Sequence, residues 1–258
     1  EAQALGYAEA DPTFDVDGQD AGHKLALLAA LAFGVRPDFD AVHLEGIRGI
    51  TPADFRAADE LGYRIKLLAV AARTPGGIEA RVSPTMIPRS SALASVDGVL
   101  NCVAVEADFV GQIILAGPGA GSRPTASSVA SDIVDIARGH RGLPFILPAA
   151  KLESQKPAGM CTHEGGFYIR LSVYDRPGAI AAIATRMAEQ NISLESVVQK
   201  REAPDLPGFG RPGKEGEPTP VVMITHRTRE NLLRFALDAI VKDGHVAGTP
   251  QMIRIEAL

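Results

Sequence analysis

The sequence lacks any long apolar run and has only two cysteines. No uninterrupted stretch reaches the roughly 18 apolar residues that a membrane-spanning helix needs, and we expect no secretory signal. Cys102 and Cys161 are far apart and show no metal-ligand spacing, which favours reduced thiols in a cytoplasmic protein over a disulfide framework. The six histidines also lack such spacing. The sequence therefore predicts neither a membrane span nor a metal site.

An excess of positive charge and an initiating methionine are also absent. The 258 residues carry a formal net charge of -5, which argues against nucleic acid as a partner. The chain begins with Glu1-Ala2-Gln3, in a stretch that is typical of a helix ending at Gly6. We therefore expect it to be part of a longer protein. Its length and its 46% hydrophobic content are typical of globular proteins with more than one domain.

The most informative stretch is the acidic run from Glu9 to Lys24. Pro12 and Gly18 predict a loop, and the Ala/Leu-rich residues that follow predict a helix over residues 19–33. Asp20 and Lys24 are four residues apart at the start of this helix, so their side chains share a face. The run contains five carboxylates before its lysine, at Glu9, Asp11, Asp15, Asp17 and Asp20.

Three interpretations of this run compete. A calcium loop with Gly18 at its sixth position would place Lys24 at the twelfth, where a bidentate carboxylate is needed. An ammonium group cannot ligate a cation, so the calcium interpretation fails. A solvated loop with an ordinary ion pair remains open. So does a catalytic site, in which Lys24 transfers a proton while the carboxylates hold a polar or cationic substrate.

The residues up to 138 predict an α+β layer with one covered face. A helix begins with Thr51 as its N-cap and Pro52 at its first position. The expected strands form two hairpins, over residues 64–73 with 78–83 and 99–107 with 110–116. The glycine-rich turn at 117–125 precedes a helix over 126–138 and could present N–H groups to an anion. It fits neither G-x-G-x-x-G nor a P-loop, so a plain turn is the favoured interpretation.

From residue 167 the elements follow a β-α-β-β-α-β order, which predicts a ferredoxin-like sandwich. The expected strands cover 167–175, 192–200, 220–226 and 252–257, with helices over 176–190 and 228–242, the second capped by Thr228. In the D-R-P-G stretch, Gly178 allows close backbone approach, and the helix start offers free N–H groups to a carboxylate. Asn191 could reach across from a neighbouring turn. An ordinary helix start is an equally good interpretation.

Two of these stretches resemble known families. Residues 2–25, A-Q-A-L-G-Y-A-E-A-D-P-T-F-D-V-D-G-Q-D-A-G-H-K-L, resemble the substrate-binding segment of homoserine dehydrogenase, and Asp175-Arg176-Pro177-Gly178 resembles the ligand loop of an ACT domain. The resemblance implies that Lys24 is the proton donor and acceptor and that Asp20 positions it. The remaining implied roles are substrate contact for Tyr7, Glu9 and Asp15, and a place beside the cofactor for Gly119, Ala120 and Gly121.

The resemblance also implies an organisation and an activity. Residues 1–140 would form a catalytic and dimerisation region with a mixed sheet, in which 117–140 returns toward a nucleotide-binding domain outside this chain. Residues 141–164 would be a linker, and 165–258 an ACT domain whose Asp175, Gly178 and Asn191 bind an amino acid effector, with threonine as the candidate. The implied reaction interconverts L-homoserine and L-aspartate 4-semialdehyde with NADP or NAD, in threonine, methionine and isoleucine biosynthesis. A homodimer or homotetramer is expected.

One alternative has no catalysis. A chain without a dinucleotide-binding fold cannot hold NAD(P) by itself, so these residues alone are predicted to be inactive. They could then serve as an amino-acid-sensing and oligomerisation module.

Overall fold

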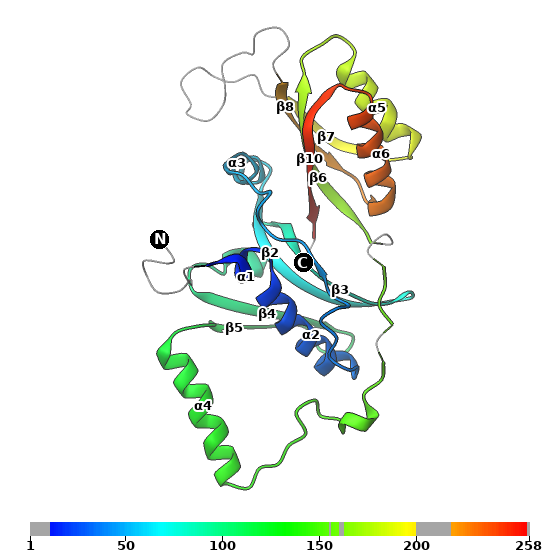
Figure 1. Cartoon of the computed structure of the whole chain (residues 1–258). Coiled ribbons are helices and arrows are strands. Elements are labelled where there is room, and N and C mark those ends of the chain that lie inside the picture. Colours follow the sequence, from blue (N-terminus) through cyan, green and yellow to red (C-terminus); the bar gives the residue numbers. More distant parts are fainter. Residues whose placement is uncertain (1–10, 155, 160–162, 200–217, 257–258) are drawn as a thin grey trace.

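The computed structural model describes residues 11–154, 156–159, 163–199 and 218–256 (Figure 1). Its first half contains α1 (Thr13–Val16), α2 (Gln19–Phe33), β1 (His43–Leu44), α3 (Pro52–Glu60), β2 (Tyr63–Thr74), β3 (Gly77–Pro88), the 3-10 helix η1 (Ala92–Ser95), β4 (Leu100–Ala107), β5 (Gly111–Pro118) and α4 (Ser122–Ala137). Its second half contains the 3-10 helix η2 (Ala149–Lys151), β6 (Glu164–Tyr174), α5 (Ala179–Glu189), β7 (Leu194–Gln199), β8 (Pro218–Thr225), β9 (Thr228–Arg229), α6 (Glu230–Lys242) and β10 (Val246–Ile255).

Most expected elements are present, but several local predictions are wrong, including the start of the last strand, which is Val246 and not residue 252. The residues before α2 are not entirely loop, because 13–16 form the short helix α1. Helix α4 begins at Ser122, four residues before the expected start. Thr228 does not cap α6. Thr228 pairs with Gly165 of β6 and is extended, and Arg229 is the N-cap of α6.

One mixed sheet runs through both halves of the chain. Its order is β1-β3-β10-β6-β8-β7, with β2 paired along β3 and β9 paired with β6. The two halves meet where β10 runs parallel to β3, with Arg254 opposite Thr85 and Ile255 opposite Met86. The last strand of the ferredoxin-like sandwich therefore continues into the sheet of the first half.

Helices cover both faces of this junction. Alternate residues of β6, including Phe167 and Ile169, pack under α5 and α6 in the largest apolar core. The opposite face of β6 carries Tyr168, which packs with Ala58 of α3 in a second cluster. Helix α2 covers β2 and β3 through a third cluster that contains Leu25. Residues 34–51, which include β1, connect α2 to α3 (Figure 1).

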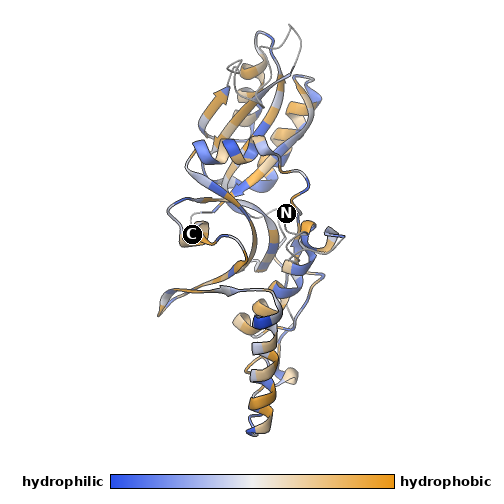
Figure 2. Cartoon of the chain, turned by 90° about the vertical axis from the view of Figure 1, so that its left-hand side faces the viewer, coloured by the Kyte–Doolittle hydropathy of each residue, from blue (hydrophilic) through white to orange (hydrophobic). Residues whose placement is uncertain are grey.

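The β4–β5 hairpin and α4 extend away from this body (Figure 1). No residue of α4 is buried, although Val129, Ile133 and Ile136 form an apolar stripe. Figure 2 shows this helix at the bottom of the molecule, with the apolar colour concentrated in its lower half. Within the part of the chain that the structure describes, no helix combines the length and the apolar character needed to cross a lipid bilayer.

The connection between the two halves is attached to the first half at two places. Glu153 exchanges backbone hydrogen bonds with the end of α2, donating to Gly34 and accepting from Arg36 at 3.1 and 2.9 Å. Ile78 at the start of β3 makes the second attachment, through hydrogen bonds with Lys156 and Ala158 of 2.9 Å each. These contacts bring the chain back along the hairpin before β6 begins.

Candidate active site

The pair predicted at the start of α2 is formed. The Lys24 ammonium donates a hydrogen bond to Oδ2 of Asp20 at 2.6 Å, as expected for residues four apart on a helix. The Lys24 side chain is 62% exposed and that of Asp20 is 40% exposed. An amine and a carboxylate are therefore presented together at the surface, where a small polar molecule can reach both.

A glycine sets the angle between the two helices of the acidic segment. Gly18, between α1 and α2, has a φ of 78°, which a residue with a side chain rarely adopts. A Cβ at Gly18 would also lie 2.9 Å from Cγ1 of Val82 in β3. The segment thus turns sharply against the sheet, which places α1 beside the first turn of α2.

The other predicted substrate residues are only partly placed. Asp15 is exposed on α1, next to the helix that carries Asp20 and Lys24. Tyr7 and Glu9 lie outside the described residues. His23 is turned away from Lys24 and stacks on Phe39 with ring centroids 3.8 Å apart. The structure therefore brings Asp20 and Lys24 together, and a complete ring of acids around them stays a prediction.

Arg48 contacts the acidic segment in a way that the sequence did not indicate. Its guanidinium donates to both carboxylate oxygens of Asp17, at 2.6 and 3.1 Å, and lies 3.4 Å from Oγ1 of Thr13. The hydrogen bond from Arg48 lowers the pKa of Asp17 below its ordinary value. Arg48 stands in E-G-I-R-G-I, and no spacing rule relates it to an acid 31 positions earlier.

The predicted cofactor residues form an exposed turn between β5 and α4. Gly119, Ala120 and Gly121 connect the end of the strand to the first turn of the helix. A Cβ at Gly119 would overlap the Asn101 side chain, since its distance to Nδ2 would be 1.9 Å. The turn therefore lies close to β4 on one side and has an exposed backbone. It leads into α4, whose apolar stripe is uncovered.

The predicted effector residues do not converge within one chain. Asp175 and Gly178 precede α5, where Gly178 has a φ of 89° and acts as the N-cap. Asn191 follows the other end of the same helix, also with a positive φ, of 55°. Eleven helical residues span about 16 Å, so Asn191 cannot meet the Asp175–Gly178 loop of its own chain across that distance.

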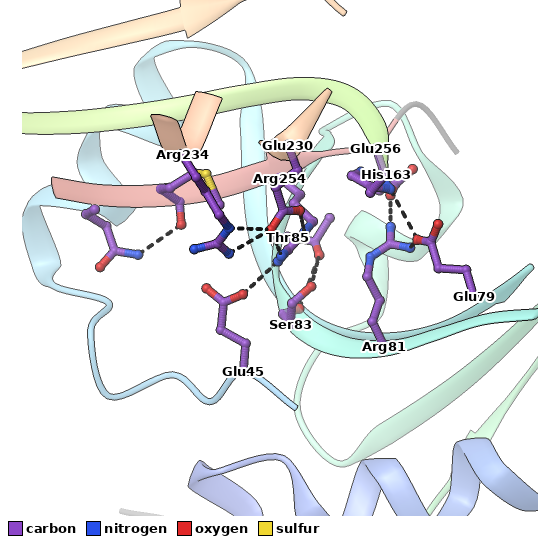
Figure 3. A network of polar contacts seen from close by, with 12 residues as sticks. Glu45, Glu79, Arg81, Ser83, Thr85, His163, Glu230, Arg234, Arg254 and Glu256 are labelled. Atoms are coloured by element: carbon purple, nitrogen blue, oxygen red, sulfur yellow. Dashed lines mark hydrogen bonds and ion pairs between the residues drawn. The ribbon is translucent and has the colours of Figure 1, made fainter. Parts of the chain in front are cut away.

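A network of buried charges lies where β3 meets β10 (Figure 3). Arg254 of β10 is 1% exposed and donates to both carboxylate oxygens of Glu230 at the start of α6, at 2.9 and 2.8 Å. Burial would raise the pKa of Glu230, but the arginines beside it hold that pKa below its ordinary value. Next to this pair, Arg81 of β3 is ion-paired with Glu79 and Glu256. The polar face of β3 is thus covered, where the sequence indicated only one covered face.

The described residues show no cluster of three or more His, Cys, Asp or Glu side chains that could hold a metal ion.

Comparison with known proteins then decides the family. The homoserine dehydrogenase family model matches residues 1–134, slightly more than half of the 258 residues. This chain belongs to the homoserine dehydrogenase family. An ACT domain model matches residues 167–208.

Individual relatives agree with this family. The chain is 44% identical over 265 residues to a homoserine dehydrogenase of Neisseria gonorrhoeae, and 39% identical over 256 residues to one of Helicobacter pylori. These alignments cover 100% and 99% of this chain, but 58% of either relative. The crystal structure of a homoserine dehydrogenase from Thiobacillus denitrificans superposes with a TM-score of 0.86 at 41% identity, over 99% of this chain and 57% of that one. The chain thus spans somewhat more than half the length of these family members.

Proposed function

We propose that this chain is the substrate-binding and regulatory part of a homoserine dehydrogenase, which interconverts L-homoserine and L-aspartate 4-semialdehyde with NAD or NADP. The Asp20–Lys24 pair carries the proposal, because an accessible amine beside a carboxylate lies within the segment that the family model matches. We also propose that the protein works in the cytoplasm, in threonine, methionine and isoleucine biosynthesis. The cysteine pattern supports the cytoplasmic location, and membership of the homoserine dehydrogenase family supports the pathway.

Lys24 is the proposed proton-transfer residue. Reduction of the aldehyde leaves an alkoxide oxygen that needs a proton, and lysine carries one at neutral pH. In the oxidation direction the neutral amine accepts the hydroxyl proton. Asp20, at 2.6 Å, holds the Lys24 nitrogen in one place. Asp15 and Glu9 are the proposed contacts of the substrate ammonium group, fixing the carbon that reacts.

The nicotinamide cofactor is proposed to be bound mainly by residues outside this chain. When bound, it exchanges the hydride with the substrate carbon. The Gly119–Gly121 turn fits the edge of such a site, because its backbone is exposed and two of its three residues lack a side chain. The uncovered apolar stripe of α4 fits a covering nucleotide-binding domain. The 58% coverage of the relatives leaves enough sequence for such a domain.

Amino acid regulation through the ACT domain is the second part of the proposal, with threonine as the candidate effector. The exposed Asp175–Gly178 loop and the residue Asn191 lie at opposite ends of α5. A site that uses both therefore needs two copies of the chain, which supports the proposed homodimer or homotetramer. Titration calorimetry on the full-length protein should show heat with threonine. Heat with another amino acid instead would remove threonine from the proposal.

The test of the catalytic proposal is kinetic and uses the full-length protein. Lys24→Ala is expected to lower kcat by about 100-fold or more, the usual contribution of a positioned acid or base. Lys24→Arg should lower it as much, because arginine keeps the ion pair with Asp20 but does not give up its proton. Lys242→Ala, at an exposed lysine in the last turn of α6, is the control and should keep full turnover.

Three outcomes would contradict this proposal. Wild-type turnover by Lys24→Ala would remove the proton-transfer role. Dehydrogenase turnover by residues 1–258 alone would contradict the proposal that the cofactor site lies mainly outside this chain. If the full-length protein also shows no turnover with homoserine, the amino-acid-sensing module becomes the better interpretation.

A further inference from the structure

We propose that the segment Glu45–Asp54 couples the ACT sheet to the substrate site, and that Arg48 is its positioning residue. This inference rests on the proposed function, since the side chains that it positions are those of the α1–α2 segment. Three observations support it. Both ends of the segment are held by residues of β6 and β10, its middle holds α1, and it contains no long flexible stretch.

The first end of the segment is fixed by a buried arginine. Glu45 accepts a hydrogen bond of 2.7 Å from Nη1 of Arg254, whose other nitrogens are bound to Glu230 of α6 (Figure 3). A buried guanidinium is strongly destabilised when it loses a partner. A displacement of β10 or of the start of α6 is therefore transmitted to Glu45.

The other end of the segment is fixed by β6. Asp54 accepts hydrogen bonds from Arg170 at 2.7 and 3.1 Å and from the hydroxyl of Tyr168 at 3.0 Å. A further contact lies between the two ends, where a Cβ at Gly49 would be 2.7 Å from Oε1 of Gln251 in β10. The segment is thus in contact with the ACT sheet at both ends and near its centre.

The centre of the segment holds α1 by three different contacts. The backbone N–H of Ile47 donates to the carbonyl of Val16 at 2.9 Å. Arg48 makes a bidentate contact with Asp17, with hydrogen bonds of 2.6 and 3.1 Å. Gly46 lies so close to α1 that a Cβ there would be 2.5 Å from the Val16 carbonyl oxygen. Backbone, side chain and steric contacts together fix α1 against the segment.

Movement of the segment has a direct route to the proposed catalytic residues. Asp17 is the C-cap of α1 and precedes Gly18, the N-cap of α2. The first turns of α2 carry Asp20 and Lys24. The stretch between Glu45 and the start of α3 is short and contains a turn closed by a 3.0 Å hydrogen bond from Ile50. It therefore cannot absorb much displacement between its two fixed ends.

The first experiment measures Arg48 variants of the full-length protein. Arg48→Ala should raise KM for homoserine roughly tenfold and leave KM for the cofactor and the melting temperature unchanged, because only the substrate side is displaced. Arg48→Lys keeps the charge but loses the bidentate geometry, so we expect KM for homoserine to rise about threefold. Arg64→Ala removes another exposed arginine–aspartate ion pair, in which one guanidinium nitrogen of Arg64 contacts both carboxylate oxygens of Asp97, and should not change either KM.

The second experiment tests the coupling through a double-mutant cycle. Glu45→Gln weakens the contact with Arg254 and leaves that arginine its two bonds to Glu230, so the protein should still fold. It should raise KM for homoserine when Arg48 is present and have no further effect in the Arg48→Ala background. Glu256→Gln is the control. It weakens the ion pair between Glu256 and Arg81 in the same junction and changes no residue of the segment Glu45–Asp54.

The same variants can be compared without turnover. Hydrogen exchange over residues 11–24 of the full-length protein should become faster in Glu45→Gln and Arg48→Ala, and no faster in the double variant than in Arg48→Ala. Exchange in α5 should not change. Additive KM effects together with unchanged exchange over residues 11–24 would overturn the coupling. A protein that lacks turnover with homoserine, but shows the expected exchange, would retain the coupling and lose the proposed function.

Discussion

Asp54 is predicted to be the carboxylate whose loss most weakens the attachment of the ACT sheet to the first half. It is fully buried, and it receives two hydrogen bonds from Arg170 and one from the Tyr168 hydroxyl. It also accepts from the backbone N–H and hydroxyl of Thr51, at 2.8 and 2.7 Å, in a capping box at the start of α3. Burial would raise the pKa of Asp54, but the hydrogen bonds from Arg170 and Thr51 hold it below its ordinary value.

The size of the effect follows from these contacts. Removing one partner of a buried ion pair costs about 3–5 kcal/mol, and losing a capping side chain costs about 1 kcal/mol. The Arg170 side chain is 21% exposed, so water can replace part of what it loses. We therefore expect Asp54→Ala to lower the free energy of unfolding by about 4 kcal/mol, a large part of the ~5–15 kcal/mol typical of a domain. Urea denaturation followed by circular dichroism measures it.

Two further variants decide whether the reasoning is right. Asp59→Ala, on the same helix but in an exposed ion pair with Arg89, should cost only a small fraction of the Asp54→Ala loss. The double variant Asp54→Ala with Arg170→Met should regain much of that loss, because no guanidinium is then left without its partner. Equal losses for Asp54 and Asp59, or no recovery in the double variant, would refute the explanation.

Two other predictions concern the first half of the chain. The hydrogen bond from His163 holds the pKa of Glu79 below its ordinary value of 4.5, so this pair stabilises the fold above the unfolded-state pKa and loses that contribution as the pH falls through the folded-state pKa. Melting temperatures measured at decreasing pH should therefore fall less steeply for Glu79→Gln than for the wild type, and parallel slopes would contradict this. In α2, a Cβ at Gly22 would lie 2.9 Å from the Phe39 ring. We expect Gly22→Ala to cost about 1–3 kcal/mol of unfolding free energy from overpacking, whereas Gly142→Ala, with nothing within 4 Å, should be neutral in the same denaturation assay.

Local spacing made much of the fold predictable. The helix bounds at 19–33, the Thr51-Pro52 helix start and the β-α-β-β-α-β order follow from the apolar period, from capping residues and from turns. The cap predicted at Thr228 was wrong for a tertiary reason, since pairing with β6 keeps that residue extended. Start positions of helices and strands were the weakest predictions, because pairing and packing with distant strands shift them.

The candidate site divides in the same way. Asp20 and Lys24 could be paired from the sequence, because four residues make just over one helical turn. Asp175 and Asn191 flank the helix expected over 176–190, so their separation along α5 also followed from the sequence. Arg48 was missed because an exposed arginine between glycines is most often an ordinary surface residue.

The sequence by itself determined most of the helices and strands, and that an amine and a carboxylate share the start of α2. Only the tertiary structure decided that β10 lies beside β3, that α3 covers the ACT sheet, and that Asp54 binds an arginine 116 residues away. The physical reason is the range of the interactions. Helix and strand patterns depend on neighbours within a few residues, whereas strand order and buried charge pairs depend on which distant surfaces exclude water together.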